Sequence, residues 1–81
     1  MKIVLAPFSS SNIAVQIKKY ILNEYNITSS IVPTPKKLSL SGCGFCVKTD
    51  YENASKIREA IKTLNVNSKG IFDAQTYEKI F

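Results

Sequence analysis

The sequence contains no histidine and no tryptophan, and arginine accounts for only one of its eleven basic residues. Without histidine, the chain has no imidazole to bind a metal ion. A structural zinc site needs four ligands, and two cysteines supply only half of them, so zinc would have to be shared between two subunits. We therefore expect no metal and no cofactor.

Long apolar runs are also missing. No stretch reaches the roughly 18 apolar residues of a membrane-spanning helix, and the apolar run at the N-terminus is too short for a signal peptide. The formal charge of +5 comes mainly from lysines that are scattered along the chain. A nucleic-acid-binding surface would instead show a clustered basic stripe with arginine or aromatic partners. These absences predict a cytoplasmic protein that binds neither membranes nor nucleic acid.

The residues that are present indicate one small globular domain. The chain has 81 residues, of which 44% are hydrophobic and 21% are charged. A chain of this length can bury one modest core. We expect a single domain over residues 1–81, with its core at 1–72 and a C-terminal extension at 73–81.

The spacing of apolar residues predicts four strands and two helices. The expected elements are a strand at 2–8 that ends at Pro7, a helix from 9–12 to 23–26, a strand at 27–32, a strand at 44–49, a helix from Asp50 to Leu64, and a strand at 70–72. This order predicts an α+β domain with the ferredoxin-like βαββαβ plait, in which two helices cover one face of an antiparallel sheet. We expect four isoleucines on the two helices to be buried against the sheet: Ile17, Ile21, Ile57 and Ile61.

The extension ends in the apolar residues Tyr77, Ile80 and Phe81, which follow a near-helical spacing. Large apolar side chains at the end of a small chain must cover some surface. The segment therefore forms either a short helix, packed on the sheet or on a second subunit, or a frayed end. Packing on a second subunit would give a weak homodimer. In that case the domain could be a regulatory or assembly module without thiol chemistry.

Both cysteines lie in residues 33–48, which read Pro-Thr-Pro-Lys-Lys-Leu-Ser-Leu-Ser-Gly-Cys-Gly-Phe-Cys-Val-Lys. Cys43 and Cys46 form a Cys-x-x-Cys motif. They could be two small buried residues, or a dithiol redox pair in which Cys46 resolves a bond to Cys43. The redox interpretation would suit a long helix starting at Cys46. The alternating pattern of 44–49 instead indicates a strand, with Cys46 on the same face as Lys48 and partly exposed.

The interpretation that we prefer is a single reactive thiol at Cys43. Glycines on both sides let the backbone approach a partner closely and direct its amides inward. Nearby ammonium groups and amides would stabilise the thiolate. The residues that would stabilise an anion there are Lys36, Lys37, Ser41, Gly42 and Gly44.

These features together resemble a family of small bacterial proteins grouped as selenium/sulfur carrier-like. The resemblance rests most on Pro33-Thr34-Pro35 with a basic residue after it, followed by Cys43-Gly44, and it extends to about Phe72. It implies that Cys43 holds sulfur or selenium as a persulfide or selenopersulfide, in a loop shaped by Pro33, Thr34, Pro35 and Gly44. It also implies a donor and an acceptor protein as partners, and a carrier in place of a stand-alone enzyme.

Overall fold

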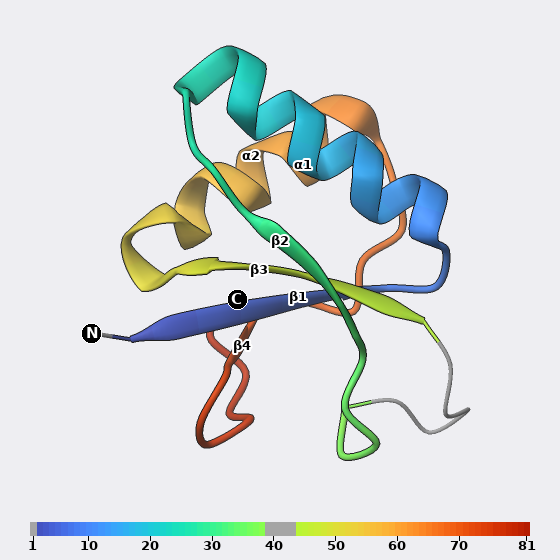
Figure 1. The fold of residues 1–81 in the computed structure, drawn as a ribbon, viewed down its shortest axis with the longest axis vertical. Coiled ribbons are helices and arrows are strands. Elements are labelled where there is room, and N and C mark those ends of the chain that lie inside the picture. Colours follow the sequence, from blue (N-terminus) through green and yellow to red (C-terminus); the bar gives the residue numbers. More distant parts are fainter. Residues whose placement is uncertain (1, 39–43) are drawn as a thin grey trace.

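The structure is a computed structural model that describes residues 2–38 and 44–81 (Figure 1). The predicted site residues Ser41, Gly42 and Cys43 lie outside the described residues. The elements are β1 (Ile3–Phe8), α1 (Ser11–Tyr25), β2 (Ser30–Pro33), β3 (Phe45–Asp50), a short 3₁₀ helix (Tyr51–Asn53), α2 (Ala54–Leu64) and β4 (Phe72–Asp73).

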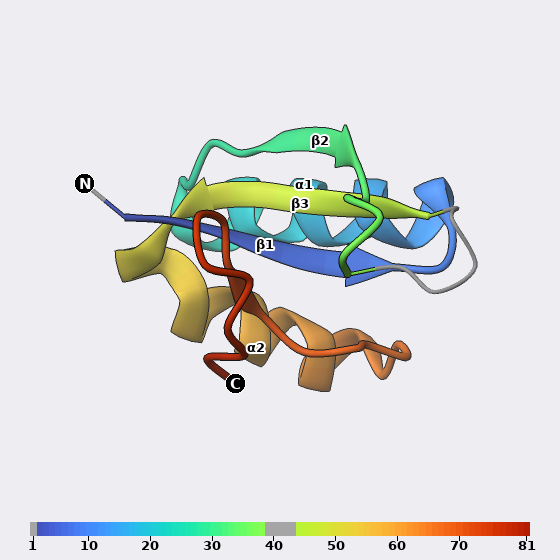
Figure 2. The same ribbon diagram turned by 90° about the horizontal axis from the view of Figure 1, so that it is seen from below.

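The four strands form one antiparallel sheet in the order β2-β3-β1-β4. Figure 1 shows both helices above this sheet, and residues 34–38 and the C-terminal segment below it. Figure 2 looks onto the lower face, with β2, β3 and β1 side by side and α1 behind them. The predicted α+β plait is therefore confirmed, as is the antiparallel pairing of β2 with β3.

The core lies between the sheet and the helices. Alternate residues of β1 point to the helices, so Val4, Ala6 and Phe8 belong to one buried cluster with α1 and α2. The predicted burial of the helix isoleucines is confirmed for three of them, Ile17, Ile21 and Ile57, which have no exposed surface. The prediction was wrong for Ile61, which is only partly buried and packs at the margin of the cluster.

Several predicted boundaries differ from the structure, and the last strand, expected at 70–72, is Phe72–Asp73. β1 continues through Pro7 to Phe8, because β4 pairs only with Val4 and Leu5 and leaves Pro7 free of a strand on that side. β2 begins three residues later than expected and includes Pro33, which an edge strand tolerates. The second helix begins at Ala54 and not after Asp50, since the 3₁₀ helix comes first and Asp50 makes no side-chain capping hydrogen bond.

The C-terminal segment forms neither a helix nor a frayed end. The Asp73 carboxylate accepts hydrogen bonds from the N–H groups of Gln75 (2.7 Å) and Thr76 (3.0 Å), which turns the chain back along β4. The Ile80 N–H then donates to the Ile71 carbonyl at 2.7 Å. Ile80 packs against the core of its own domain. The homodimer stays a prediction, for which the exposed Phe81 is the side chain that remains most available.

Candidate functional site

The two ends of the loop between β2 and β3 meet at Thr34 and Gly44. The Thr34 N–H donates to the Gly44 carbonyl at 3.2 Å. The Thr34 side chain also contacts Cys46, two residues further along the chain than Gly44. We call Thr34, Gly44 and Cys46 the loop base. It fixes where the chain enters and leaves the segment that contains Cys43.

Gly44 occupies a position that other residues would strain. Its φ of +119° lies in a region that L side chains rarely adopt. A Cβ atom there would lie 2.8 Å from the Phe8 carbonyl oxygen and 3.3 Å from Thr34 Oγ1. The glycine therefore lets the end of the loop pass closely between the end of β1 and the Thr34 side chain.

Cys46 lies on the sheet face opposite the helices, between Val32 of β2 and Pro7 of β1 in the register of the strands. Its side chain is fully buried, and its thiol donates to Thr34 Oγ1 at 3.4 Å. Burial raises the pKa of the Cys46 thiol, and the Thr34 hydroxyl, which can donate a hydrogen bond to the thiolate, lowers it only in part. The expected partial exposure of Cys46 was wrong, because Thr34 and its neighbours cover this end of the face.

The position of Cys46 removes the structural basis of one redox interpretation. That interpretation required a helix starting at Cys46, where the positive end of the helix dipole would lower the pKa of a cysteine. Cys46 instead lies inside β3, and α2 begins eight residues later, at Ala54. A buried thiol with a raised pKa is protonated at neutral pH and is a poor nucleophile.

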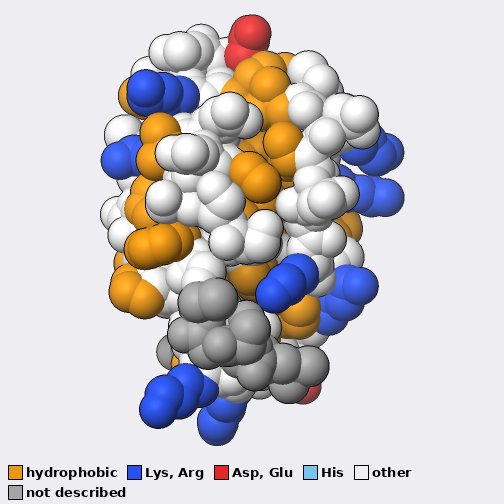
Figure 3. Space-filling view, turned by 90° about the vertical axis from the view of Figure 1, so that its right-hand side faces the viewer, with side chains coloured by type: hydrophobic (Ala, Val, Ile, Leu, Met, Phe, Trp, Pro, Cys, Tyr) orange, Lys and Arg blue, Asp and Glu red, His pale blue; other side chains and the backbone are white. Residues whose placement is uncertain are grey.

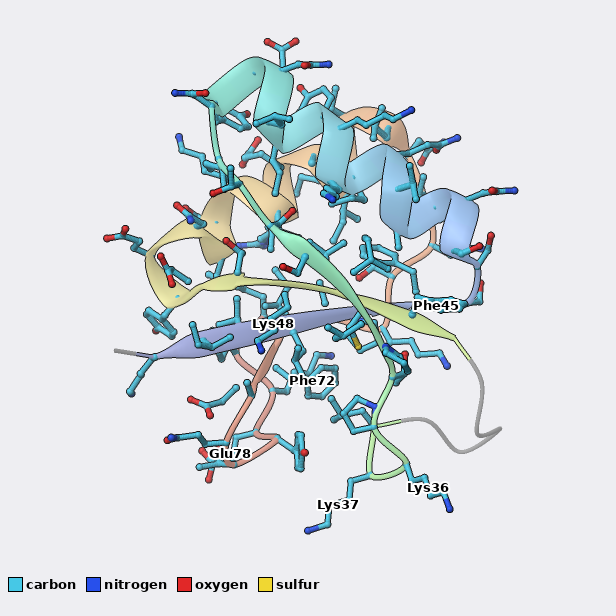
Figure 4. All side chains as sticks on the ribbon, viewed as in Figure 1. Lys36, Lys37, Phe45, Lys48, Phe72 and Glu78 are labelled. Carbon is cyan, nitrogen blue, oxygen red and sulfur yellow. The ribbon has the colours of Figure 1, made fainter. Side chains whose placement is uncertain are left out.

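The two predicted lysines lie in a turn near the start of the loop and not at the loop base. Lys36 and Lys37 are exposed in a turn in which the Leu38 N–H donates to the Pro35 carbonyl at 2.9 Å. Figure 4 shows both side chains pointing away from the sheet. The Lys37 ammonium lies 5.8 Å from the centroid of the Tyr77 ring, a cation–π contact that joins the loop to the C-terminal segment. Stabilisation of a Cys43 thiolate by these lysines stays a prediction.

The sequence analysis missed that α1 begins beside the loop base. Phe8 pairs with Phe45, so the end of β1 lies next to the residue that follows Gly44. The chain then continues into Ser10, whose side chain accepts a hydrogen bond from the Asn12 N–H at 3.1 Å and caps α1. The N-terminus of a helix carries unpaired N–H groups and a partial positive charge. The antiparallel pairing of β1 with β3 places the end of β1, and therefore the start of α1, beside the start of β3, and this pairing was the signal that could have revealed the position of α1.

Basic side chains outnumber acidic ones around the margins of the end of the molecule where α1 begins and β3 starts, while its centre is mostly uncharged (Figure 3). Figure 3 shows lysine and arginine side chains on both flanks and along the lower edge of this end, and acidic side chains only near its upper and lower margins. In residues 2–38 and 44–81, no group of three or more His, Cys, Asp or Glu side chains could hold a metal ion. Over the same part of the chain, no helix is long and apolar enough to cross a membrane.

Comparison with known proteins gives one match. No curated protein and no solved structure matches the chain. A family model described as "Putative Se/S carrier protein-like" matches residues 4–73, which run from the second residue of β1 to the end of β4 and include both cysteines. The match covers most of the 81 residues, and the chain therefore belongs to this Se/S carrier protein-like family.

Proposed function

We propose that the chain carries a sulfur or selenium atom on Cys43, as a persulfide or selenopersulfide, between a donor and an acceptor protein. Membership of the Se/S carrier protein-like family supports this function. The observation that carries the assignment to Cys43 is the full burial of Cys46. With the Cys46 thiol kept protonated by burial, the nucleophilic chemistry of the Cys-x-x-Cys motif falls to Cys43.

The transfer is an exchange at sulfur that needs no external oxidant or reductant. The Cys43 thiolate attacks the terminal sulfur of a persulfide on the donor protein, and a new S–S bond forms at Cys43. The S–S bond of the donor breaks, and its cysteine leaves as a thiolate. An acceptor thiolate then takes the terminal sulfur from Cys43 by the same exchange. A selenopersulfide follows the same course, with selenium in place of the terminal sulfur.

Both the thiolate and the persulfide are anions, so this chemistry gains from positive charge near the loop. The N-terminus of α1, which begins just after Phe8, is one source of such charge. Lys36 and Lys37, which are exposed in the turn after Pro35, are a second source. The loop base holds Gly44, the residue bonded to Cys43, beside Thr34 and the end of β1.

Mass spectrometry after incubation with a persulfide donor, such as glutathione persulfide, tests the proposal. We expect the intact mass to rise by about 32 Da, one sulfur atom, in the wild type and in Cys46→Ala, with the adduct on the peptide that contains Cys43. The Cys43→Ser variant should gain no sulfur. Addition of sulfur to Cys43→Ser, or no addition to Cys46→Ala, would show that Cys43 is not the carrier.

A further inference from the structure

The helix α2 and the C-terminal segment enclose a cleft of about 290 Å³ on the side of the molecule away from β2. Figure 2 shows the C-terminus beside α2. Four basic side chains line the cleft from three parts of the chain: Arg58 and Lys62 on α2, Lys69 before β4, and Lys79 in the C-terminal segment. Its described lining contains no acidic side chain. A carboxylate at Phe81 would offset one of these charges and leave three.

The walls of this basic cleft are built by specific packing. The Arg58 guanidinium lies 5.3 Å from the centroid of the Phe81 ring. Gly70, with φ of +107°, lets the Lys79 side chain and the Phe81 carbonyl approach its backbone, where a Cβ atom would lie within 2.8 Å of each. Ile71, at the back of the cleft, is buried. The cleft therefore combines an apolar floor with a rim of positive charge.

A smaller hollow of about 90 Å³ extends the cleft toward the loop base. It shares Ser68 and Lys69 with the basic cleft and reaches Phe8 and Ser9 at the end of β1. The Phe8 carbonyl is the group that Gly44 approaches most closely. An extended chain in the basic cleft could thus continue to the base of the loop that carries Cys43.

We infer that the basic cleft is the docking site for an acidic segment of the transfer partner, with an apolar residue between its carboxylates. The cations are spread along the rim, and three of the four are lysines, which act as point charges without the fixed fork that phosphate recognition favours. Such a rim matches a row of carboxylates better than one compact anion. The identification of the protein that carries this segment as a transfer partner rests on the proposed function. The binding of an acidic segment in the cleft does not.

The test uses the ¹⁵N-labelled full chain and a blocked probe peptide, Glu-Asp-Glu-Leu-Glu-Asp-Glu, with a Gln/Asn version of the same length as its control. We expect the acidic peptide to change the amide chemical shifts of residues 58–62, 68–71 and 79–81 until they saturate. The neutral peptide should leave these shifts unchanged. Raising NaCl should weaken binding, because exposed charges are screened. Lys62→Gln with Lys69→Gln should raise the dissociation constant by about fivefold, as expected for two exposed pairs.

The matched control is Lys18→Gln with Lys19→Gln on α1, which removes the same charge outside the cleft and should change the constant by less than about twofold. Equal weakening by both double variants, or no saturable shifts, would overturn the proposal. Inorganic phosphate that binds more tightly than the peptide would also overturn it and indicate a small-anion site. Loading of sulfur on Cys43 is measured separately, so failure of docking and failure of the carrier function are distinguishable.

Discussion

The Sγ atom of Cys46 lies 3.4 Å from Oγ1 of Thr34, so a buried thiol on β3 contacts the residue that closes the loop between β2 and β3. Thr34 also bonds through its backbone N–H to Gly44. Thr34 thus contacts both Cys46 and Gly44, the residue that follows Cys43 in the chain. Under the proposed function, Cys46 would support the loop and Cys43 would carry the sulfur or selenium atom.

Thr34→Val tests that contact. Valine keeps the shape of threonine and the backbone bond to Gly44, but it removes the acceptor for the Cys46 thiol. We expect the free energy of unfolding to fall by about 1 kcal/mol, the usual net contribution of one hydrogen bond, as measured by urea denaturation. Thr63→Val, an exposed threonine on α2, is the matched control. The same loss in both variants would mean that the Cys46 contact adds nothing.

Gly44→Ala tests the close approach at the loop base. The added Cβ would lie 2.8 Å from the Phe8 carbonyl oxygen, at a φ of +119°. We expect a loss of about 1–3 kcal/mol in the free energy of unfolding from backbone strain. Ser55→Ala, on the exposed face of α2, should change stability by less than about 0.5 kcal/mol. A Gly44→Ala variant as stable as the wild type would contradict the described geometry.

Ile57→Ala and Ile61→Ala compare two positions one helical turn apart on α2. Ile57 is fully buried, whereas Ile61 is only partly buried. Removing the buried side chain should cost about 2–5 kcal/mol, because it leaves a cavity in the core. The loss for Ile61→Ala should be clearly smaller in the same denaturant melts. Similar losses would show that α2 turns both positions equally toward the sheet.

The raised pKa of Cys46 predicts a pH dependence of stability. Folding favours the protonated thiol, so its stabilisation is fully present below the unfolded pKa of about 8.5 and is lost as the pH rises through the higher folded pKa. On a Cys43→Ser background, we expect the stability advantage of Cys46 over Cys46→Ala to stay constant from about pH 6 to 8 and to shrink above about pH 8.5. If the stability advantage of Cys46 instead grows with pH, folding lowers the pKa of Cys46, which would contradict this prediction.

Much of the fold could be predicted from the sequence, because local patterns encode it. The apolar period of residues 13–22 placed α1, and the alternation of 44–49 placed β3 with Cys46 and Lys48 on one face. The boundaries at Pro7 and Ala54 could not be predicted. The first depends on how far β4 extends along β1, and the second on a 3₁₀ helix that replaces a side-chain cap.

The candidate site was less predictable, because its geometry depends on distant parts of the chain. Alternation assigns Cys46 to a face, but its burial depends on Thr34, twelve residues earlier. The approach of α1 to Gly44 depends on the pairing of Phe8 with Phe45. The basic cleft joins residues from 58 to 81, and no local pattern in the sequence marks it.

The rates at which iodoacetamide alkylates the two cysteines at neutral pH test the central claim most directly. Peptide mapping by mass spectrometry gives each rate in the native wild-type protein. We predict that Cys43 reacts at least about tenfold faster than Cys46, a difference of about 1.4 kcal/mol, because burial keeps Cys46 protonated and covered. Equal rates, or faster labelling of Cys46, would contradict the assignment of the chemistry to Cys43.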